Sequence, residues 1–181
     1  MKTSTVIGVV AALIVAGGAW YWLQTGAAPL AQNIADYNYK NATYTIEGQS
    51  VTLVNGHAEV EVAAAPAMYA KVVTDYFGNE ATGDLNGDGT ADTAFILYQD
   101  PGGSGTFYYV VVALKTATGY QGTNAVLLGD RIAPQTTEIR DGELIVNYAD
   151  RAPGEPFAAQ PSVGVSKYLK VQGTTLIESL K

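Results

Sequence analysis

Four oxygen-bearing side chains recur at regular spacing in a short, glycine-rich segment of the chain. The segment reads Asp84-Leu-Asn86-Gly-Asp88-Gly-Thr90-Ala-Asp92, which places these side chains at its first, third, fifth and ninth positions. Gly89 holds the sixth position, where such a loop turns sharply, and Thr90 offers its backbone carbonyl from the seventh. A hard cation such as calcium needs about six to eight oxygen ligands. The spacing therefore predicts a calcium site made by Asp84, Asn86, Asp88, Thr90 and Asp92.

The twelfth position of this segment departs from the usual helix–loop–helix calcium site. Phe95 stands there instead of glutamate, so the bidentate carboxylate is missing, and the residues that follow resemble a strand. Glu80 and Asp100 are candidates for a further ligand. Magnesium keeps more of its water, and zinc prefers cysteine or histidine, of which the chain has only His57. The alternative to a calcium site is an acidic turn that binds no metal.

Acidic side chains dominate the middle of the chain. Residues 72–114 contain six carboxylates and no Lys or Arg, and the whole chain has a net charge of −7. Clustered carboxylates repel one another unless water or a cation neutralises them, so this stretch fits either a solvated face or a cation site. A negative protein also lacks the basic contacts that nucleic acid and anionic lipid heads require. We therefore expect no nucleic-acid partner.

The first 23 residues have the features of a membrane-crossing segment. Residues 5–23 form an uncharged run of 19 residues. A helix rises about 1.5 Å per residue, so this run nearly spans a hydrocarbon core of about 30 Å. Lys2 precedes the run, and aromatic residues 20–22 lie at its far end, where they favour the membrane interface. Residues 1–23 are therefore predicted to be a signal anchor that holds the domain in the membrane, facing the periplasm or the cell exterior.

A cleaved signal peptide is the competing interpretation of residues 1–23. Small residues that suit a signal peptidase lie at 26–28 and at Ala31, but Pro29 hinders cleavage at both places. Cleavage would make the protein secreted. A buried helix of a soluble domain is disfavoured by Gly17, Gly18 and the adjacent aromatic residues. The chain has no cysteine, which excludes disulfides and a lipid anchor through cysteine.

β-strand patterns dominate residues 41–181, after a polar, alanine-rich linker at residues 24–40. β-branched and aromatic residues cluster in short runs, and no long 3.6-residue period occurs. The expected strands are Thr43–Ile46, Ser50–Val54, His57–Val62, Met68–Tyr76, Ala94–Tyr98, Thr106–Leu114, Ala125–Leu128, Gln135–Ile139, Leu144–Tyr148, Val163–Val171 and Thr175–Ile177. The pattern predicts a single mainly β domain, or an α+β domain with few helices, built as an antiparallel sandwich or barrel.

Glycine-containing turns separate several of these strands. Asn55-Gly56 is the dipeptide typical of a tight hairpin turn, so the strands on either side of it are expected to pair. The breaker Asp100–Gly105 joins two apolar runs that also look like a hairpin. Asp141-Gly142 and Gln172-Gly173 mark further turns.

The Asp84–Asp92 segment resembles the strand-flanked calcium loops of FG-GAP repeats and, less closely, dockerin loops. Because the segment occurs once, the resemblance implies the metal site but neither a propeller nor a cohesin partner. From Asn41 onward the chain is also similar to a group of small exported bacterial proteins with no assigned activity. That similarity rests on Tyr76–Asn79, the Asp84–Asp92 segment, Asp100–Tyr109, Leu128–Arg131 and Asn147–Pro156. It implies an extracytoplasmic location and a related fold.

Patterns that indicate a nucleophile are sparse. Ser104 lies in Gly-Gly-Ser-Gly, but Thr106 replaces the second glycine of a nucleophile elbow. His57 is the only imidazole and lies in an expected exposed hairpin. We assign no catalytic residue from these patterns.

Two loops combine carboxylates with arginines. Asp130, Asp150 and Glu155 lie near Arg131 and Arg151 in the sequence. The alternatives are salt bridges that anchor the loops, or the carboxylate pair of a hydrolase acting on glycans. The twelve tyrosines fall mostly in expected strands, where they serve packing or form an aromatic platform for a carbohydrate. We expect a non-catalytic, calcium-stabilised extracytoplasmic envelope domain with a protein or glycan partner; the alternative is a carboxylate-dependent hydrolase or other glycan-active enzyme.

Overall fold

The structure, a computed structural model, describes residues 38–65 and 68–179, with the side chains of residues 62–70 left out. Contacts divide the chain into two units, and every described residue belongs to the second, residues 36–181. The expected anchor at residues 1–23 and most of the linker at 24–40 lie outside the described residues. Within these residues, no helix has the length and apolar character needed to cross a membrane.

Strands account for nearly all regular structure in the described residues, which confirms the mainly β class. The elements are a 3-10 helix η1 (Tyr39–Asn41) and the strands β1 (Thr43–Ile46), β2 (Gln49–Thr52), β3 (His57–Ala65), β4 (Met68–Gly83), β5 (Asp92–Asp100), β6 (Phe107–Thr116), β7 (Gly119–Gly122), β8 (Val126–Asp130), β9 (Ala133–Arg140), β10 (Glu143–Asp150), β11 (Val163–Gln172) and β12 (Thr175–Glu178).

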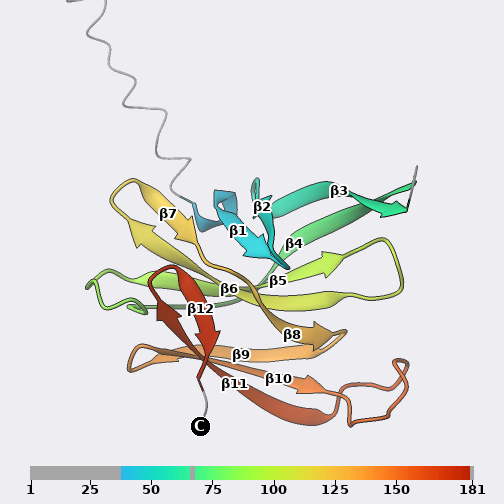
Figure 1. Ribbon diagram of the computed structural model, residues 1–181. Coiled ribbons are helices and arrows are strands. Elements are labelled where there is room, and N and C mark those ends of the chain that lie inside the picture. Colours follow the sequence, from blue (N-terminus) through green and yellow to red (C-terminus); the bar gives the residue numbers. More distant parts are fainter. Residues whose placement is uncertain (1–37, 66–67, 180–181) are drawn as a thin grey trace, which may run out of the picture. The chain divides into compact units, whose positions relative to one another are not determined.

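Three antiparallel sheets are built from these strands (Figure 1). The central sheet has the order β3-β4-β5-β6-β7, with β8 pairing the first half of β6. A second sheet has the order β12-β11-β10-β9, and β1 and β2 form a separate hairpin. Antiparallel pairing is therefore confirmed. The barrel alternative is wrong, because the sheets of the described residues form no closed cylinder.

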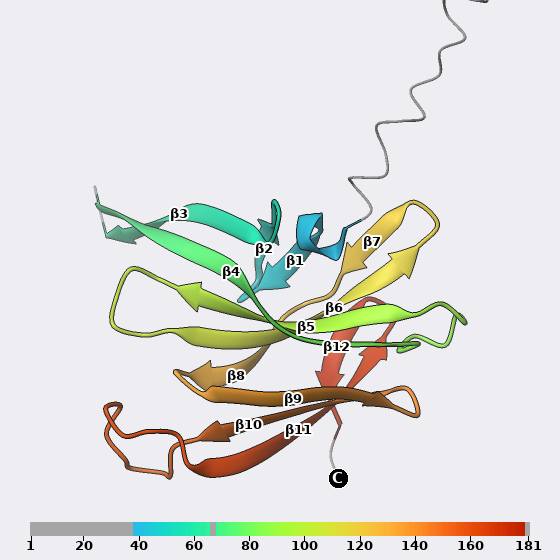
Figure 2. The same ribbon diagram turned by 180° about the vertical axis from the view of Figure 1, so that it is seen from behind.

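The central sheet is covered on both faces. One face contributes Ile96, Val110 and Val112 to a core shared with Leu144 and Leu169 of the second sheet. The other face contributes Phe95, Leu97 and Val111 to a core under the β1–β2 hairpin. Figures 1 and 2 show this hairpin above the central sheet, with β9, β10 and β11 below it. Because successive strand residues point to opposite faces, burial on both faces requires continuous apolar runs, as β5 and β6 have.

The long strand β4 also reaches the second sheet. Its register with β5 shifts around Gly78, and its last third approaches β9. The side-chain amide of Asn79 donates to the backbone carbonyl of Gln135, at 3.0 Å. A Cβ atom on Gly83 would lie 2.8 Å from the Ile139 side chain, so glycine allows this close approach. The irregular stretch of β4 therefore holds the hairpin loop after Gly83 close to both sheets.

The Asn55-Gly56 turn forms, but the hairpin expected around it does not continue. Both residues have positive φ, 54° and 86°, as a tight hairpin turn requires. Only Val54 and His57 pair across the turn. Beyond them β2 pairs with β1, whereas β3 pairs with β4. The expected pairing of residues 50–54 with 57–62 is wrong, because each strand finds a different partner in a different layer.

Candidate metal centre

The predicted metal-binding segment is the hairpin loop between β4 and β5, drawn in green in Figure 1. The two strands pair up to Gly83 and Asp92, so residues 84–91 connect them at one end of the central sheet. Leu85 is the apolar anchor of this loop, because its side chain is 5% exposed and packs in the core shared by the two sheets. The remaining loop residues from Asn86 to Ala91 are exposed.

Asp84 closes the loop through its carboxylate. Its Oδ1 accepts a hydrogen bond from the backbone N–H of Gly87 at 2.7 Å, and its Oδ2 accepts one from Gly89 at 2.9 Å. Both glycines have φ near 80°, a conformation that other residues rarely adopt. The glycines at the fourth and sixth positions are therefore required by the backbone turn, whether or not an ion binds.

Asn86 and Asp88 are joined at the tip of the loop. The Asn86 side-chain oxygen accepts from the backbone N–H of Asp88, and its amide donates to Asp88 Oδ2, both at 3.0 Å. Asp88 Oδ1 accepts from the backbone N–H of Thr90 at 2.7 Å. These bonds, led by the one from Thr90, favour the ionised form and hold the pKa of Asp88 below its ordinary value. Asp88 is thus an exposed carboxylate that stays charged.

Asp92 is the buried carboxylate of this segment. It is 0% exposed, and its two oxygens accept hydrogen bonds from the backbone N–H groups of Leu85 and Lys115, at 3.0 and 2.9 Å. Burial raises the pKa of Asp92 despite these bonds. The residue therefore ties the loop to the end of β6. The alternation of side chains along a strand could have indicated that Asp92 is buried, because Asp92 points to the same core face as Ala94 and Ile96.

Four of the five predicted ligands thus lie in one loop and the fifth, Asp92, begins β5, but their carboxylates form no metal-binding group. Over the described ranges 38–65 and 68–179, no three His, Cys, Asp or Glu side chains form a group that could hold a metal ion. Asp100 does not supply the missing ligand, because it ends β5 roughly 26 Å from Asp92. Glu80 accepts hydrogen bonds from the hydroxyls of Tyr39 and Tyr76. Phe95, at the twelfth position, is buried in the core.

The donor set still suits a hard cation. Asp84, Asn86 and Asp88 supply only oxygen donors from exposed or half-exposed positions. Each carboxylate oxygen that accepts one backbone N–H keeps a second lone pair for a metal. Asp88 Oδ2, which accepts from the Asn86 amide, likewise keeps one lone pair. Because no metal-binding group of three acidic side chains forms in the described residues, binding at this loop requires its side chains to turn toward one ion.

The second group of acidic residues anchors loops. Asp130 receives two hydrogen bonds from the Arg131 guanidinium, at 3.0 and 2.8 Å, and one from the backbone N–H of Thr106 at 2.9 Å. The hydrogen bonds from Arg131 lower the pKa of Asp130. A general acid of a glycosidase needs a raised pKa, so Asp130 has the wrong environment for that role.

Arg151 fastens the long connection between β10 and β11. Its guanidinium donates to the backbone carbonyls of Ala159, Asp130 and Arg131, at 2.7, 3.2 and 3.1 Å. Glu155 accepts a hydrogen bond from the backbone N–H of Ala152, inside the same connection. Loop anchoring therefore describes this region, but through one salt bridge, Arg131–Asp130, and otherwise through hydrogen bonds to the backbone.

His57 pairs with carboxylates on β3 and β4. Its Nδ1 lies 2.7 Å from Asp75 Oδ1, and its Nε2 lies 3.7 Å from Glu59 Oε1. The hydrogen bond with Asp75 raises the pKa of His57. Ser104 is exposed in the loop between β5 and β6, and no contact of the described residues joins it to His57. These positions offer no support for a Ser–His pair.

Comparisons with known proteins supply no functional assignment, so the proposal below rests on the geometry of the site. No family model, no curated protein and no solved structure matches the chain.

Proposed function

We propose that residues 41–181 form a non-catalytic extracytoplasmic domain of sandwich type that a calcium ion stabilises at the Asp84–Asp92 loop. The predicted signal anchor at residues 1–23, or a signal peptide in its place, would put this domain in the envelope or outside the cell. Its role there is to bind a protein or a glycan. The domain needs no cysteine for stability outside the cytoplasm, because it has two sizeable apolar cores.

One observation carries the calcium proposal. The Asp84 carboxylate accepts hydrogen bonds from the N–H groups of Gly87 and Gly89, and this closure holds Asp84, Asn86 and Asp88 within one tight turn. Asp84, Asp88 and Asp92 concentrate acidic charge at this turn. A divalent cation would remove this repulsion and fix the loop. Extracellular modules bind calcium with dissociation constants of about 10⁻⁴–10⁻³ M, so an incomplete ligand set suffices there.

A carboxylate-dependent enzyme has less support. The arginines and backbone N–H groups around Asp130, Asp150 and Glu155 already occupy these carboxylates. The hydrogen bonds from Arg131 lower the pKa of Asp130, whereas a general acid requires a raised pKa.

Thermal unfolding with calcium and with a chelator tests the proposal. A ligand that binds only the folded state, at 100 times its dissociation constant, stabilises by about 2.7 kcal/mol. For a domain of this size we expect the melting temperature to rise by roughly 5–10 °C. Asp88→Ala removes one exposed ligand and should abolish most of this rise. Asp100→Ala is the matched control, because it removes a carboxylate at the opposite end of β5 and should keep the calcium effect.

The competing outcomes are distinct. Equal melting temperatures with calcium and chelator would remove the metal from the proposal and leave an acidic turn. An equal rise with magnesium would indicate general charge screening rather than a calcium site.

A further inference from the structure

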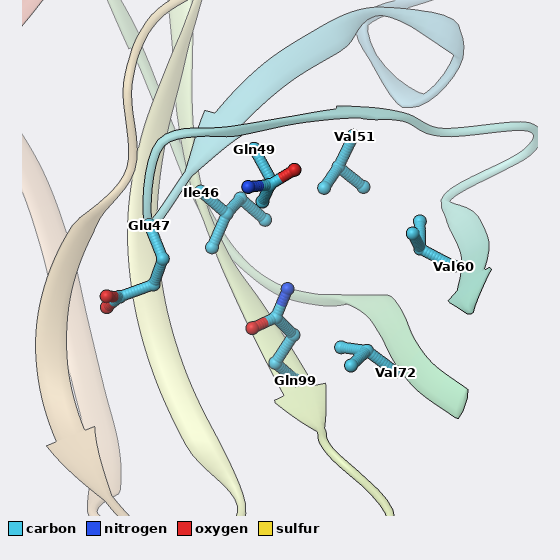
Figure 3. Close-up of a pocket in the computed structure, with 7 residues that line it drawn as sticks. All are labelled: Ile46, Glu47, Gln49, Val51, Val60, Val72 and Gln99. Carbon is cyan, nitrogen blue, oxygen red and sulfur yellow. The ribbon is translucent and has the colours of Figure 1, made fainter. Parts of the chain in front are cut away.

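A small apolar cleft lies next to the Asn55-Gly56 turn, where strands β2 and β3 separate instead of pairing. It has a volume of about 180 Å³ and lies between the β1–β2 hairpin and the central sheet (Figure 3). Its apolar lining is Ile46, Val51, Val60 and Val72. A cavity of about 150 Å³ with such a lining takes a benzene-sized group, so this cleft has room for one apolar side chain. Gln49 and Gln99 place amide groups beside the aliphatic lining.

Strand edges flank this β2–β3 cleft. Val54 and His57 exchange both backbone hydrogen bonds, at 2.8 and 3.2 Å, so their N–H and C=O groups face each other across the turn. In an antiparallel strand every second residue points its backbone groups to the same side. The groups of Glu59 and Glu61 on β3 therefore point away from β4, toward the side where β2 lies at the turn.

The edge of β2 across the cleft also has backbone groups that point away from its partner strand. Leu53 donates its N–H to Ala42, on the β1 side. Thr52 and Ser50, like Val54, therefore direct their backbone groups away from β1. A continued hairpin would pair Thr52 with Glu59 and Ser50 with Glu61. The sheets contain neither pair, since β2 pairs with β1 and β3 with β4.

We propose that the β2–β3 cleft binds an extended peptide segment of a partner protein, which adds to the β3 edge as a strand and inserts one aliphatic side chain between Val51 and Val60. Backbone pairing supplies affinity in this mode of recognition, and a pocket for alternate side chains supplies specificity. The cleft offers both, because its flanking strand edge lies beside an apolar cavity. This inference rests on the proposed binding role of the domain but does not require calcium.

Charge around the cleft specifies the flanks of the segment. Glu47 lines the cleft, whereas Glu59 and Glu61 flank Val60 on β3, so their side chains lie on the opposite face of this edge strand. The nearby Lys71 is paired with Glu59 at 2.6 Å. A second copy of this strand would bring like charges together, which is unfavourable. Lys or Arg residues on either side of the aliphatic anchor are complementary, so the expected partner segment is basic and extended.

Peptide binding to the full-length chain in detergent micelles tests this assignment. Fluorescence anisotropy would compare labelled Thr-Lys-Thr-Lys-X-Lys-Thr-Lys-Thr peptides with X as Val, Leu or Gly. The Val and Leu peptides should bind at least about tenfold more tightly than the Gly peptide, because they bury one aliphatic side chain. Amide hydrogen exchange at Glu59 and Glu61 should slow when the peptide binds.

Two variants test separately how the cavity and the β3 strand edge contribute to peptide binding. Val60→Phe fills the cavity and should remove the preference for Val over Gly. Glu61→Pro removes an N–H that points away from β4, a position where an edge strand accepts proline. It should weaken binding by about tenfold or more, whereas Glu61→Ala, which loses the same charge, should bind within about threefold of the parent.

The inference is overturned if the Val and Gly peptides bind equally, or if Glu61→Pro binds as tightly as Glu61→Ala. Concentration-dependent dimers that Glu61→Pro abolishes would assign the edge to a second copy instead. Displacement of the peptide by a soluble oligosaccharide would assign the cleft to a glycan. All binding assays are run with calcium and with chelator. If calcium stabilises the protein but no peptide binds, the peptide inference fails and the calcium proposal stands.

Discussion

The carboxylate of Asp92, the first residue of β5, accepts a hydrogen bond from the backbone N–H of Lys115 near the end of β6, at 2.9 Å. The ladder between these strands ends earlier, at Thr93 and Ala113. Asp92 therefore continues the pairing with its side chain where the backbone pairing stops. Its second oxygen accepts from Leu85, so one buried carboxylate links the loop, β5 and β6.

Replacement of this carboxylate should destabilise the fold without reference to calcium. Asp92→Ala leaves the N–H groups of Leu85 and Lys115 without their partner. Each unsatisfied buried donor costs about 1–3 kcal/mol, so we expect a loss of roughly 2–5 kcal/mol in urea unfolding with chelator present. Asp88→Ala, an exposed change in the same loop, should cost less than about 1 kcal/mol under these conditions. Equal losses of stability in the two variants would contradict the role of Asp92 in linking the loop to β6.

Gly122 should tolerate no side chain. It lies on β7 opposite Ala113, and a Cβ atom there would be 2.2 Å from the backbone oxygen of Thr43 on β1. Gly122→Ala must displace the β1–β2 hairpin, with an expected loss of about 1–3 kcal/mol or more in chemical unfolding. Gly103→Ala is the matched control, because no atom lies within 4 Å of its added Cβ. A neutral Gly122→Ala would refute the close approach of β1.

His57 should titrate above its ordinary value. The hydrogen bond with Asp75 favours the protonated ring and raises the pKa of His57 above 6.5. A raised pKa in the folded state means that the pair stabilises the fold fully below about pH 6.5. This contribution is lost as the pH rises through the folded pKa. NMR titration should show the raised pKa, and Asp75→Asn should bring it down; an unchanged pKa in that variant would exclude Asp75 as the cause.

Arg151 should control the order of the connection between β10 and β11. Arg151→Ala removes three hydrogen bonds to backbone carbonyls, one of them within this connection at Ala159. We expect faster limited proteolysis between residues 151 and 162, together with a fall in melting temperature. Arg140→Ala removes an exposed arginine paired with Glu138 on β9 and should leave this cleavage rate unchanged. Equal rates in both variants would mean that Arg151 does not fasten the connection.

Strand positions followed closely from the sequence. The expected Thr43–Ile46, Val163–Val171 and Thr175–Ile177 coincide with β1, β11 and β12 to within a residue at each end. The breaker after Asp100 produced the expected hairpin of β5 and β6. The short β7 (Gly119–Gly122) was missed, because two of its four residues are glycine and carry no strand signal.

The candidate site was predictable in part. The sequence located the loop and the sharp turn at Gly89, which has a φ of 83°. It did not separate the half-buried Asp84 and the exposed Asp88 from the buried Asp92, because that distinction depends on the N–H groups of Leu85 and of Lys115 on β6. Calcium binding itself stays a prediction that rests on the donor pattern.

By itself the sequence determined what is local: strand propensity, turn dipeptides and the acidic loop, because each depends on neighbouring residues and their backbone angles. Only the tertiary structure decided which strands pair and which layers cover them. Asn55-Gly56 illustrates the difference, since the turn formed as expected while β2 and β3 joined different sheets. Contacts with β1 and β4, made by residues distant in the chain, outweighed the local hairpin and left the β2–β3 cleft open.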